Sequence, residues 1–462
     1  MDLIAQAIGI VFQPLHLLLL LGSVFMGILV GAAPGLTPTM AIGLLIPATY
    51  AMSGYAAFIM LLGIYCGGIY GGSITAILLN VPSTPTSAIT AIEGYPMTLK
   101  GEGGRALGMA AMASAIGGLF SCIVLIFLSM KLAKVATIFG GPEYFCLGLF
   151  ATTVVFSLTG ASVVKGLIAV CLGLLFSEIG MDLICANPRF TFGIPELMMG
   201  VPSAPAIIGL LCVSEVFRLA EQSEVSAEIK KGVTGILAVW RELPGLWWTI
   251  LKSSVIGVCI GILPATGATM ASLMAYGEAK RSSKHPEKFG TGVIEGVCAS
   301  ETANNAVTGG ALIPLLTLGI PGDTNTLMMM GAMFIHGLVP GPTLFREQAT
   351  LIYVIYVAMI ASNLLILPFG LSMSKQIAKY ACLLADLGSG FAYLRPRARA
   401  VALADGNLSR GRQGLSQDSL GPDFPGSRGE HARLCRALIL SRGGKLRLGA
   451  PKVRRGRRIL IS

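Results

Sequence analysis

The feature that most constrains this sequence is a long stretch without charge near its start. No Asp, Glu, Lys or Arg occurs between Asp2 and Glu93. A helix needs about 20 mostly apolar residues to cross a bilayer, so this stretch has room for roughly three or four spanning or re-entrant segments. A charge at the bilayer centre costs about 2.5–3.5 kcal/mol, which explains why such segments lack charges. Further uncharged runs occupy residues 106–130, 144–164, 197–214, 253–277, 302–322, 324–345 and 348–374.

Composition excludes a soluble globule of this size. The chain has 462 residues, of which 54% are hydrophobic and 12% are charged, whereas a soluble domain carries about 25% charged residues. A soluble protein with a very apolar core is the rejected alternative, because its polar residues would be too few to cover the surface. We therefore predict an all-α polytopic membrane protein in the lipid bilayer, with about ten transmembrane or re-entrant segments.

The last part of the chain has a different character from the rest. Residues 387–462 contain 16 Lys and Arg against 4 Asp and Glu, and Arg outnumbers Lys by 14 to 2. One interpretation is a basic tail that binds acidic lipid or nucleic acid. The interpretation we favour is a frameshifted or otherwise unselected stretch, because the change is abrupt and falls near residues 385–389. We therefore predict a disordered or frameshifted tail and no nucleic-acid partner.

Charged loops indicate the organisation of the membrane part. Basic residues mark cytoplasmic loops, and the clearest such loop is 280–288, with Lys131 and Lys134 as another candidate. Residues 219–245 are polar and are predicted to link two halves. The predicted units are a first membrane repeat at 1–218, the linker at 219–245, a truncated second repeat at 246–386, and the tail at 387–462.

An internal repeat supports two repeat-related halves. Residues 31–41 and 261–271 share the pattern G-x-x-P-x-x-x-x-T-M-A at an offset of 230. A second pair follows in the same order: Gly71-Gly72 leads to Pro82, and Gly309-Gly310 leads to Pro321. One gap aligns both pairs, and two ordered matches at nearly one offset are unlikely to arise by chance.

These Gly/Pro-broken segments are the predicted substrate or ion site. Pro removes a backbone donor and Gly weakens a helix, which lipid tolerates only where the backbone is buried in protein or lines a wet cavity. Matched broken segments in two halves point to a transporter site, where helix N-termini face a carboxylate and freed carbonyls hold a cation. The alternative is that Pro only kinks helices and Gly only permits close packing. The candidate residues are Pro34, Gly35, Thr37, Thr39, Ser83, Thr84, Thr86, Pro264, Thr266, Thr269, Ser300, Asn304, Asn305, Asp323, Thr324 and Asn325.

A polar cluster at 300–306 adds neutral oxygens and amides between two apolar stretches. These groups suit a carboxylate ligand or a desolvated Na⁺. Glu295, Glu301 and Asp323 are the nearby carboxylates that could bind a proton or balance a cation. The alternative for Glu295 and Glu301 is a solvated position at the membrane interface.

Enzymatic motifs are missing from the sequence. It contains no P-loop, no H-E-x-x-H and no G-x-S-x-G. His16 and His336 are expected to be packed or interfacial. We therefore expect no enzyme, no catalytic residue, no metal and no cofactor, and an ion gradient of Na⁺ or H⁺ as the energy source.

In these motifs the chain resembles the large membrane subunit of the tripartite tricarboxylate transporter family. The resemblance covers about residues 1–380 and rests on 31–40, 70–82, 93–96, 141–145, 165–167, 188–193, 261–270, 295–297, 301–305 and 319–322. Ser83 stands where the family pattern has Gly, a departure that bears on ligand preference. The family continues with apolar segments after about residue 385, where this chain has its basic tail.

The resemblance implies a permease of the bacterial inner membrane. It implies symport of tricarboxylates or related carboxylates, driven by Na⁺ or H⁺, together with a periplasmic solute-binding protein and a small membrane subunit. Two alternatives stay open: a truncated or frameshifted, inactive copy of such a permease, and a channel-like membrane protein.

Overall fold

The computed structural model describes most of the membrane part of the chain. The described residues are 2–33, 35–136, 138, 140, 142–143, 145–146, 148–150, 163–181, 188–192, 194, 197–198, 200–201, 206, 208–214, 217, 236–264, 266–374 and 376–377. The predicted tail and most of the predicted linker lie outside them. The predicted division into four units is therefore not tested and stays a prediction.

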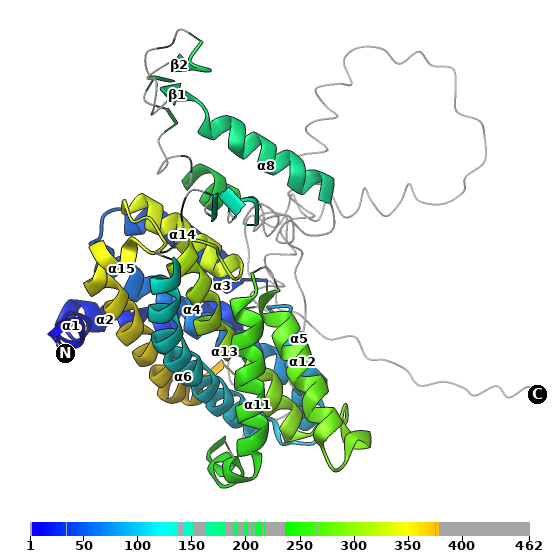
Figure 1. Cartoon of the computed structure of the whole chain (residues 1–462). Helices are drawn as coiled ribbons and strands as arrows, with labels where there is room; N and C mark the ends of the chain where they lie inside the picture. Colours follow the sequence, from blue (N-terminus) through cyan, green and yellow to red (C-terminus); the bar gives the residue numbers. More distant parts are fainter. Residues whose placement is uncertain are drawn as a thin grey trace, which may run out of the picture. The chain divides into compact units, whose positions relative to one another are not determined.

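The described residues are almost entirely helical (Figure 1). The first part contains α1 Asp2–Val11, α2 Pro14–Ala32, α3 Pro38–Thr49, α4 Gly54–Leu79, α5 Ser87–Leu99 and α6 Gly103–Ala136. Next come α8 Val163–Ser177, the antiparallel pair β1 Gly180–Met181 and β2 Pro188–Arg189, the π-helix η2 Ile208–Val213 and the 3₁₀-helix η3 Ile236–Arg241. The last part contains α11 Leu243–Ile262, α12 Gly267–Ser282, η4 Pro286–Lys288, α13 Ile294–Leu318, α14 Thr324–Ile335, α15 Leu344–Glu347 and a final helix, Ala349–Ser374.

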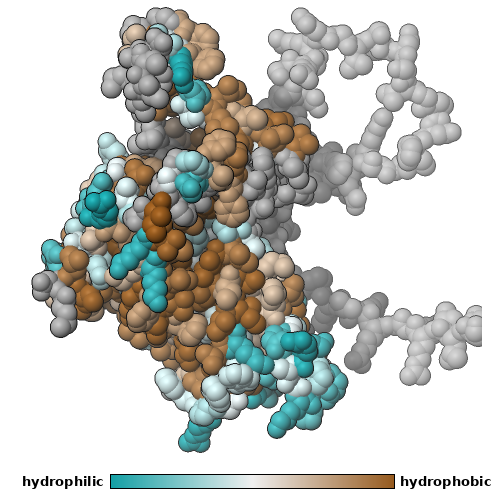
Figure 2. All heavy atoms as spheres, in the orientation of Figure 1, coloured by the Kyte–Doolittle hydropathy of each residue, from teal (hydrophilic) through white to brown (hydrophobic). Residues whose placement is uncertain are grey.

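Five of the described helices are long and apolar enough to cross a membrane: α2, α4, α6, α11 and Ala349–Ser374. The shorter apolar helices include α3 and α14. Figure 2 shows hydrophobic side chains over the middle of one face. Hydrophilic side chains gather where α11 begins and α12 ends (Figure 2). These features make the described part mostly helical and are consistent with the predicted all-α, multi-pass membrane protein, while the expected number of about ten segments stays a prediction.

Close backbone contact joins α2 to α4. A Cβ atom added at Gly31 would lie 2.2 Å from the carbonyl oxygen of Gly68, and one added at Gly27 would lie 2.7 Å from that of Ile64. Small residues allow such contact between membrane helices. Because the contacts advance in the same direction along both helices, α2 and α4 run parallel, and α3 returns the chain between them.

The same arrangement joins α11 to α13. A Cβ atom at Gly257 would lie 2.6 Å from the carbonyl oxygen of Ala303, and one at Gly261 would lie 2.9 Å from that of Val307. These two helices are therefore also parallel, with α12 between them in sequence. The Gly residues of both predicted repeat motifs, Gly31 and Gly261, thus lie at helix contacts.

Helices α4 and α13 end on the same backbone motif. Asn80 (φ 56°) and Gly319 (φ 71°) adopt the left-handed conformation directly after the last helical residue. The next amides, of Val81 and Ile320, donate to carbonyls six residues earlier at 3.4 and 3.2 Å. Since the amides of Asn80 and Gly319 themselves donate to carbonyls four residues earlier, this is an αL cap, which ends a helix sharply. Both helices therefore stop where a second broken segment begins.

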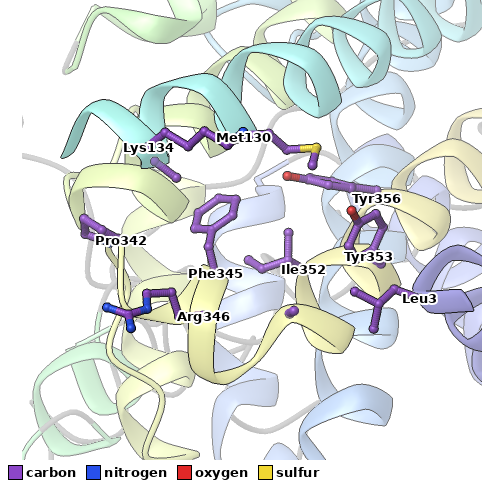
Figure 3. A pocket seen from close by; sticks show the side chains of 11 residues that line it. Leu3, Met130, Lys134, Pro342, Phe345, Arg346, Ile352, Tyr353 and Tyr356 are labelled. Atoms are coloured by element: carbon purple, nitrogen blue, oxygen red, sulfur yellow. The ribbon is translucent and has the colours of Figure 1, made fainter. Parts of the chain in front are cut away.

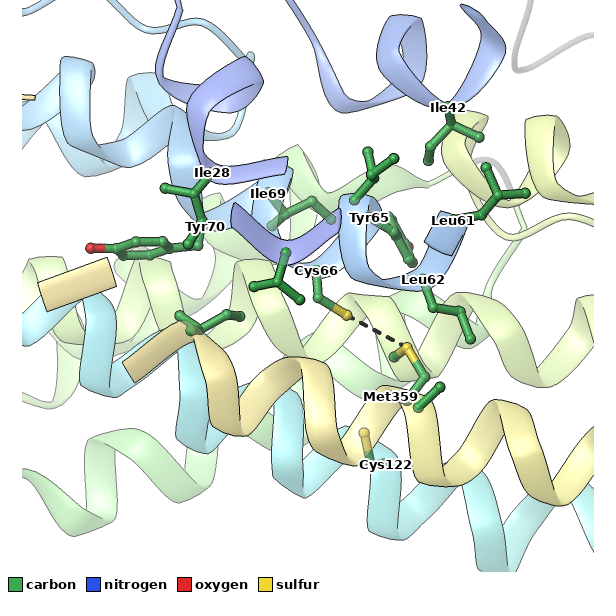
Figure 4. Packing of buried hydrophobic residues seen from close by; sticks show 14 of the residues in the cluster. Ile28, Ile42, Leu61, Leu62, Tyr65, Cys66, Ile69, Tyr70, Cys122 and Met359 are labelled. Carbon is green, nitrogen blue, oxygen red and sulfur yellow. Dashed lines mark hydrogen bonds between the residues drawn. The ribbon is translucent and has the colours of Figure 1, made fainter. Parts of the chain in front are cut away.

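The core is built around α4, which is buried along nearly its whole length. Tyr65, Cys66 and Tyr70 point from it into the packed interior (Figure 4). Cys66 Sγ lies 3.5 Å from Met359 Sδ of the helix Ala349–Ser374. The hydroxyl of Tyr70 lies 3.0 Å from Ser374 Oγ. Helix α4 therefore packs between α2 and the final helix.

Ion pairs gather at one end of the bundle. Arg105 of α6 donates to Glu242 at 2.7 Å, just before α11. Lys252 and Arg281 both pair with Glu278 of α12, at 3.1 and 2.6 Å. Hydrogen bonds from Arg281 and Lys252 lower the pKa of Glu278. The pairs of Glu278 lie next to the basic loop at 280–288, the loop that the sequence predicts to be cytoplasmic.

Candidate functional site

Four helices begin directly after the Gly/Pro-broken segments: α3, α5, α12 and α14. The first amides of a helix have no partner within it and carry partial positive charge. Thr37 caps α3, because its side chain accepts a bond from the Met40 amide at 3.2 Å. Asp323 caps α14 through a reciprocal capping box with Thr326, with bonds of 2.7 and 2.9 Å. Two of the predicted site residues are thus N-caps.

Helices α3 and α14 meet at their N-termini, although they are far apart in sequence. The hydroxyl of Thr39 donates to Asn325 Oδ1 at 2.8 Å and lies 3.2 Å from that of Thr324. Tyr65 of α4 donates to the carboxylate of Asp323 at 2.9 Å. Thr324 is exposed, and Thr39 and Asn325 are half-buried. A ligand can therefore reach this meeting point.

Helices α5 and α12 form a second meeting of N-termini. Thr86 Oγ1 lies 3.5 Å from Thr269 Oγ1. Like the first meeting, this one joins a helix from each predicted half. The structure therefore brings the predicted residues together crosswise: the first motif of one half meets the second motif of the other.

Hydroxyl side chains satisfy carbonyls that the breaks leave free. Ser83 donates to the carbonyl of Gly31 at 2.5 Å, and Thr266 donates to that of Ile260 at 2.7 Å. Thr84 accepts a bond from the Ser87 amide at 3.2 Å. These predicted site residues therefore stabilise the breaks, which removes those carbonyls from the candidate ligands for a cation.

Two further predicted residues, Gly35 and Pro264, lie in the described part of the breaks and bring no side-chain bond. Gly35 is exposed with φ 85°, a conformation that favours Gly. Pro264 is half-buried in the break before α12. Pro34 lies outside the described residues.

The polar cluster of α13 lies deep inside the bundle. Glu301 is completely buried, so the alternative of a solvated interface is wrong for this residue. Its carboxylate accepts bonds from Ser73 of α4 at 2.6 Å, from Thr90 of α5, and from Ser114 of α6 at 3.1 Å. Ser300 lies 3.1 Å from Thr90. One carboxylate thus gathers hydroxyls from three other helices.

Glu295, the second residue of α13, has a different setting. Its half-buried carboxylate accepts a bond from Thr249 of α11 at 3.0 Å. It therefore lies toward the end of the bundle and outside the polar cluster.

Within the described part of the chain, three buried polar atoms of α13 have no hydrogen-bond partner: Thr302 Oγ1, Asn304 Nδ2 and Asn305 Oδ1. A buried polar group without a partner costs about 1–3 kcal/mol. Such groups often mark places where a ligand or water completes the bonding. Asn304 and Asn305 were predicted as site residues, and they bring one unpaired donor and one unpaired acceptor.

Sequence reasoning missed the residues that surround these groups. Tyr65, Thr90 and Ser114 are single polar residues in apolar helices, and no spacing distinguishes them from hydroxyls that only pack. Ser73 lies in the motif 70–82 and was not singled out. Their roles become visible only when the helices are packed together.

A cavity of about 400 Å³ lies away from this site (Figure 3). Its walls include Phe345, Ile352, Tyr353 and Tyr356, with Lys134 on α6. No residue of the predicted site lines it, so it adds nothing to the site. Among the residues that the structure describes, no group of three or more His, Cys, Asp or Glu side chains could hold a metal ion.

The long apolar helices define a multi-pass membrane protein. The short helices whose N-termini meet within the bundle give it an internal polar site. The comparison with known families gives the particular assignment. The chain belongs to the tripartite tricarboxylate transporter TctA family, which it matches over residues 17–385. The resemblance seen in the sequence is thereby confirmed, and the chain is a membrane subunit of a transporter family. The match ends close to residues 385–389, where the composition changes.

Three proteins are similar to the chain in sequence. An uncharacterised 52.8 kDa protein from the TAR-I ttuC' 3' region of Agrobacterium vitis is 38% identical over 379 residues, covering 81% of this chain and 75% of the relative. A protein from the TAR-II ttuC' 3' region of the same organism is 40% identical over 117 residues, covering 25% and 48%. An uncharacterised protein of Methanocaldococcus jannaschii is 24% identical over 200 residues, covering 43% and 49%. No solved structure matches the chain.

Proposed function

We propose that this chain is the permease subunit of a binding-protein-dependent secondary transporter that takes up tricarboxylates or related carboxylates. The observation that carries the proposal is the crossed meeting of helix N-termini, Thr39 with Asn325 and Thr86 with Thr269. Helix N-termini attract anions through their unpaired amides and their dipoles. Two such meetings in one bundle suit a ligand with several carboxylates.

The mechanism we propose is alternating access between two repeat-related halves. In support, α2 with α4 and α11 with α13 form matching parallel pairs, and both pairs continue into an αL cap and a short helix. Because each meeting of N-termini takes one helix from each half, a rocking motion of the halves would open and close both meetings together.

The family supports a proposal for the partners and the energy source. We propose a periplasmic solute-binding protein and a small membrane subunit as partners, the bacterial inner membrane as the location, and a Na⁺ or H⁺ gradient as the driving force. The family is one of transporters, so we propose no enzymatic activity for this chain.

Uptake by membrane vesicles tests the proposal. Cells that express the chain with its binding protein and small membrane subunit supply the vesicles, and radiolabelled citrate is the probe. We expect Asn305→Ala and Asp323→Ala to abolish uptake while the protein still inserts into the membrane. Asp323→Asn keeps a capping side chain on α14, so it separates loss of the cap from loss of the charge. Wild-type uptake by both alanine variants would overturn the site assignment.

A second candidate is an inactive copy of such a permease. It is favoured by the coincidence that the family match ends at residue 385, where the Arg-rich sequence begins. Resequencing codons 380–395 tests it. A one-base slip that restores apolar segments would attribute the tail to an error, and a confirmed reading frame would leave the inactive copy as a candidate for the uptake assay to decide.

A further inference from the structure

Glu301 is a carboxylate in the middle of the bundle without a positive partner. It is fully buried, and among the described residues no Lys, Arg or His forms an ion pair with it. An unpaired charge at this depth is expensive, and such residues in membrane helices commonly carry protons or ions. The carboxylate must therefore either gain a cation or become neutral during part of a working cycle.

The partners of Glu301 suit both of its protonation states. All three donors, Ser73, Thr90 and Ser114, are hydroxyls, and a hydroxyl can donate or accept a hydrogen bond. By rotating, the same hydroxyls can donate to a carboxylate or accept from a carboxylic acid. The network extends from Thr90 to Ser300 at 3.1 Å. No atom has to move far when the proton arrives or leaves.

A second buried carboxylate shows the opposite design. Glu93 of α5 accepts bonds from the backbone amides of Gly290, Gly292 and Val293 at 2.5–2.8 Å, and from the Tyr276 hydroxyl at 2.8 Å. Amides only donate, so this setting suits the carboxylate and offers little to a carboxylic acid. Glu93 therefore ties the loop before α13 to α5, and of these two buried carboxylates Glu301 is the one whose setting accommodates a change of protonation.

The charged groups around Glu301 do not provide a counter-charge. The basic residues Arg105 of α6 and Lys252 of α11 are paired with Glu242 and Glu278 at the end of the bundle. Tyr70 of α4 is the neighbouring titratable group that interacts with Glu301 electrostatically. The remaining titratable side chains on α13 and the helices packed against it include Tyr65, Cys66, Glu93, Tyr95, Cys122, Lys131, Lys134, Cys259, Tyr276, Lys280, Arg281, Glu295, Cys298, Asp323 and His336.

Glu301 also lies close in structure to the proposed substrate contacts. Thr90, its donor on α5, is one helical turn from Thr86, which meets Thr269 of α12. Asn305, with its unpaired oxygen, is one turn from Glu301 on α13. A charge on Glu301 would repel a carboxylate ligand at these positions, and protonation would remove the repulsion. Proton binding and anion binding would then favour each other, which is the linkage that symport requires.

We propose that Glu301 is the proton-coupling site of this transporter. A proton from one side of the membrane binds a carboxylate oxygen, moves with the loaded state, and is released to the other side when the substrate leaves. No other bond forms or breaks. The inference rests on the proposed transport function and assigns its coupling ion and the residue that carries it.

Infrared spectroscopy of the purified full-length protein tests protonation without any transport assay. We expect the absorption band of a buried carboxylic acid to appear and disappear as pH is varied. Glu301→Gln should remove the band, and Glu295→Gln, a matched change on the same helix, should leave it. A wild-type protein without the band, or a band that survives Glu301→Gln, would overturn the proposal. If ²²Na⁺ binds the wild type without such a band and Glu301→Gln removes that binding, the site carries Na⁺ and the proton assignment is wrong.

Vesicle transport of radiolabelled citrate tests the coupling. Glu301→Gln imitates the protonated state, so it should exchange internal for external citrate while accumulation driven by a proton gradient falls about tenfold or more. Glu295→Gln should keep both activities within about twofold of the wild type. Glu301→Asp keeps a shorter acid and should retain part of the accumulation, which guards against a folding defect in the Gln variant.

The two tests separate the inference from the function on which it rests. Unchanged accumulation in Glu301→Gln would overturn the coupling role while leaving transport established. A wild-type chain that moves no carboxylate, but whose acid band disappears in Glu301→Gln, would overturn the proposed function and uphold the protonation of Glu301.

Discussion

Helices α4 and α13 occupy corresponding places in the two predicted halves. They differ mainly in whether their buried polar side chains have hydrogen-bond partners. Both are almost completely buried, both contact a parallel partner through Gly residues, and both end in an αL cap. Yet α4 is apolar enough to count as a membrane span, whereas α13 is not among the described candidates because it is more polar. The backbone arrangement of the two helices is matched, whereas the polar side chains are concentrated on α13.

The polar side chains of α4 are partnered. Tyr65 donates to Asp323, Tyr70 bonds with Ser374, and Ser73 donates to Glu301. In α13, by contrast, Thr302, Asn304 and Asn305 each retain a buried polar atom without a partner among the described residues. Burial therefore has different meanings in the two helices. In α4 it completes the fold, and in α13 it preserves bonding capacity that a ligand can use.

The largest effect on the free energy of unfolding should come from adding a Cβ atom at a helix contact. This effect should be equal in the two predicted halves. Gly31→Ala tests the contact of α2 with α4. Gly257→Ala tests the matching contact of α11 with α13, where the new Cβ would lie 2.6 Å from the carbonyl oxygen of Ala303. Because each Cβ meets backbone that cannot yield locally, we expect each variant to lose about 3 kcal/mol or more of unfolding free energy. Denaturant unfolding in detergent micelles measures it.

A control for this pair is Gly22→Ala, because a Cβ there has no atom within 4 Å. It should change the free energy of unfolding by about 1 kcal/mol or less, in the stabilising direction. A large loss in only one of the two contact variants would show that the scaffolds are not matched.

Removing a hydroxyl should have a smaller effect on the free energy of unfolding, with one sign for a hydroxyl that has a hydrogen-bond partner and the opposite sign for one that has none. Tyr65→Phe removes a bond to the carboxylate of Asp323, so it should lower the free energy of unfolding by about 1.5–3 kcal/mol. Thr302→Val removes a buried hydroxyl without a partner at nearly constant shape, so it should raise that free energy by about 1 kcal/mol. Both values come from the same unfolding experiment. Destabilisation by Thr302→Val would mean that its hydroxyl has a partner after all, and the contrast between the helices would weaken.

The smallest effects should come from the caps. Asn80→Gly supplies the residue that best tolerates a left-handed conformation, so it should gain up to about 0.5 kcal/mol. Gly319→Ala places a Cβ in that conformation, 3.0 Å from the carbonyl of Pro340, and should lose about 1–2 kcal/mol. Thermal unfolding of the two variants beside the wild type gives both signs. A neutral Gly319→Ala would indicate that α13 ends differently from α4.

The sequence allowed the membrane class, the family and the Gly/Pro breaks to be predicted, because each depends on local composition or on a short pattern. The repeat motif placed Thr39 and Thr269 at matching positions, and both lie at meetings of helix N-termini. That each meets the second motif of the other half could not be predicted, because pairing across more than 180 residues is decided by packing.

Other parts of the site left no pattern in the sequence. Ser73, Thr90 and Ser114 are isolated hydroxyls on three helices, and they become a cluster only around Glu301. For Glu301 itself the sequence left burial and solvation as equal alternatives, because a carboxylate beside an apolar run is compatible with either. Its surroundings on three other helices decide between them.

The crossed meetings of α3 with α14 and of α5 with α12 also bear on inheritance. Neither half of the polypeptide owns a complete contact, so a gene shortened before Thr324 loses a member of the first meeting, and one shortened before Gly267 loses a member of both. The two predicted halves, joined in this way, cannot change independently at these contacts, because a change at Thr39 is a change to the surroundings of Asn325. Selection therefore acts on the two halves as a single unit, even where their sequences have ceased to look alike.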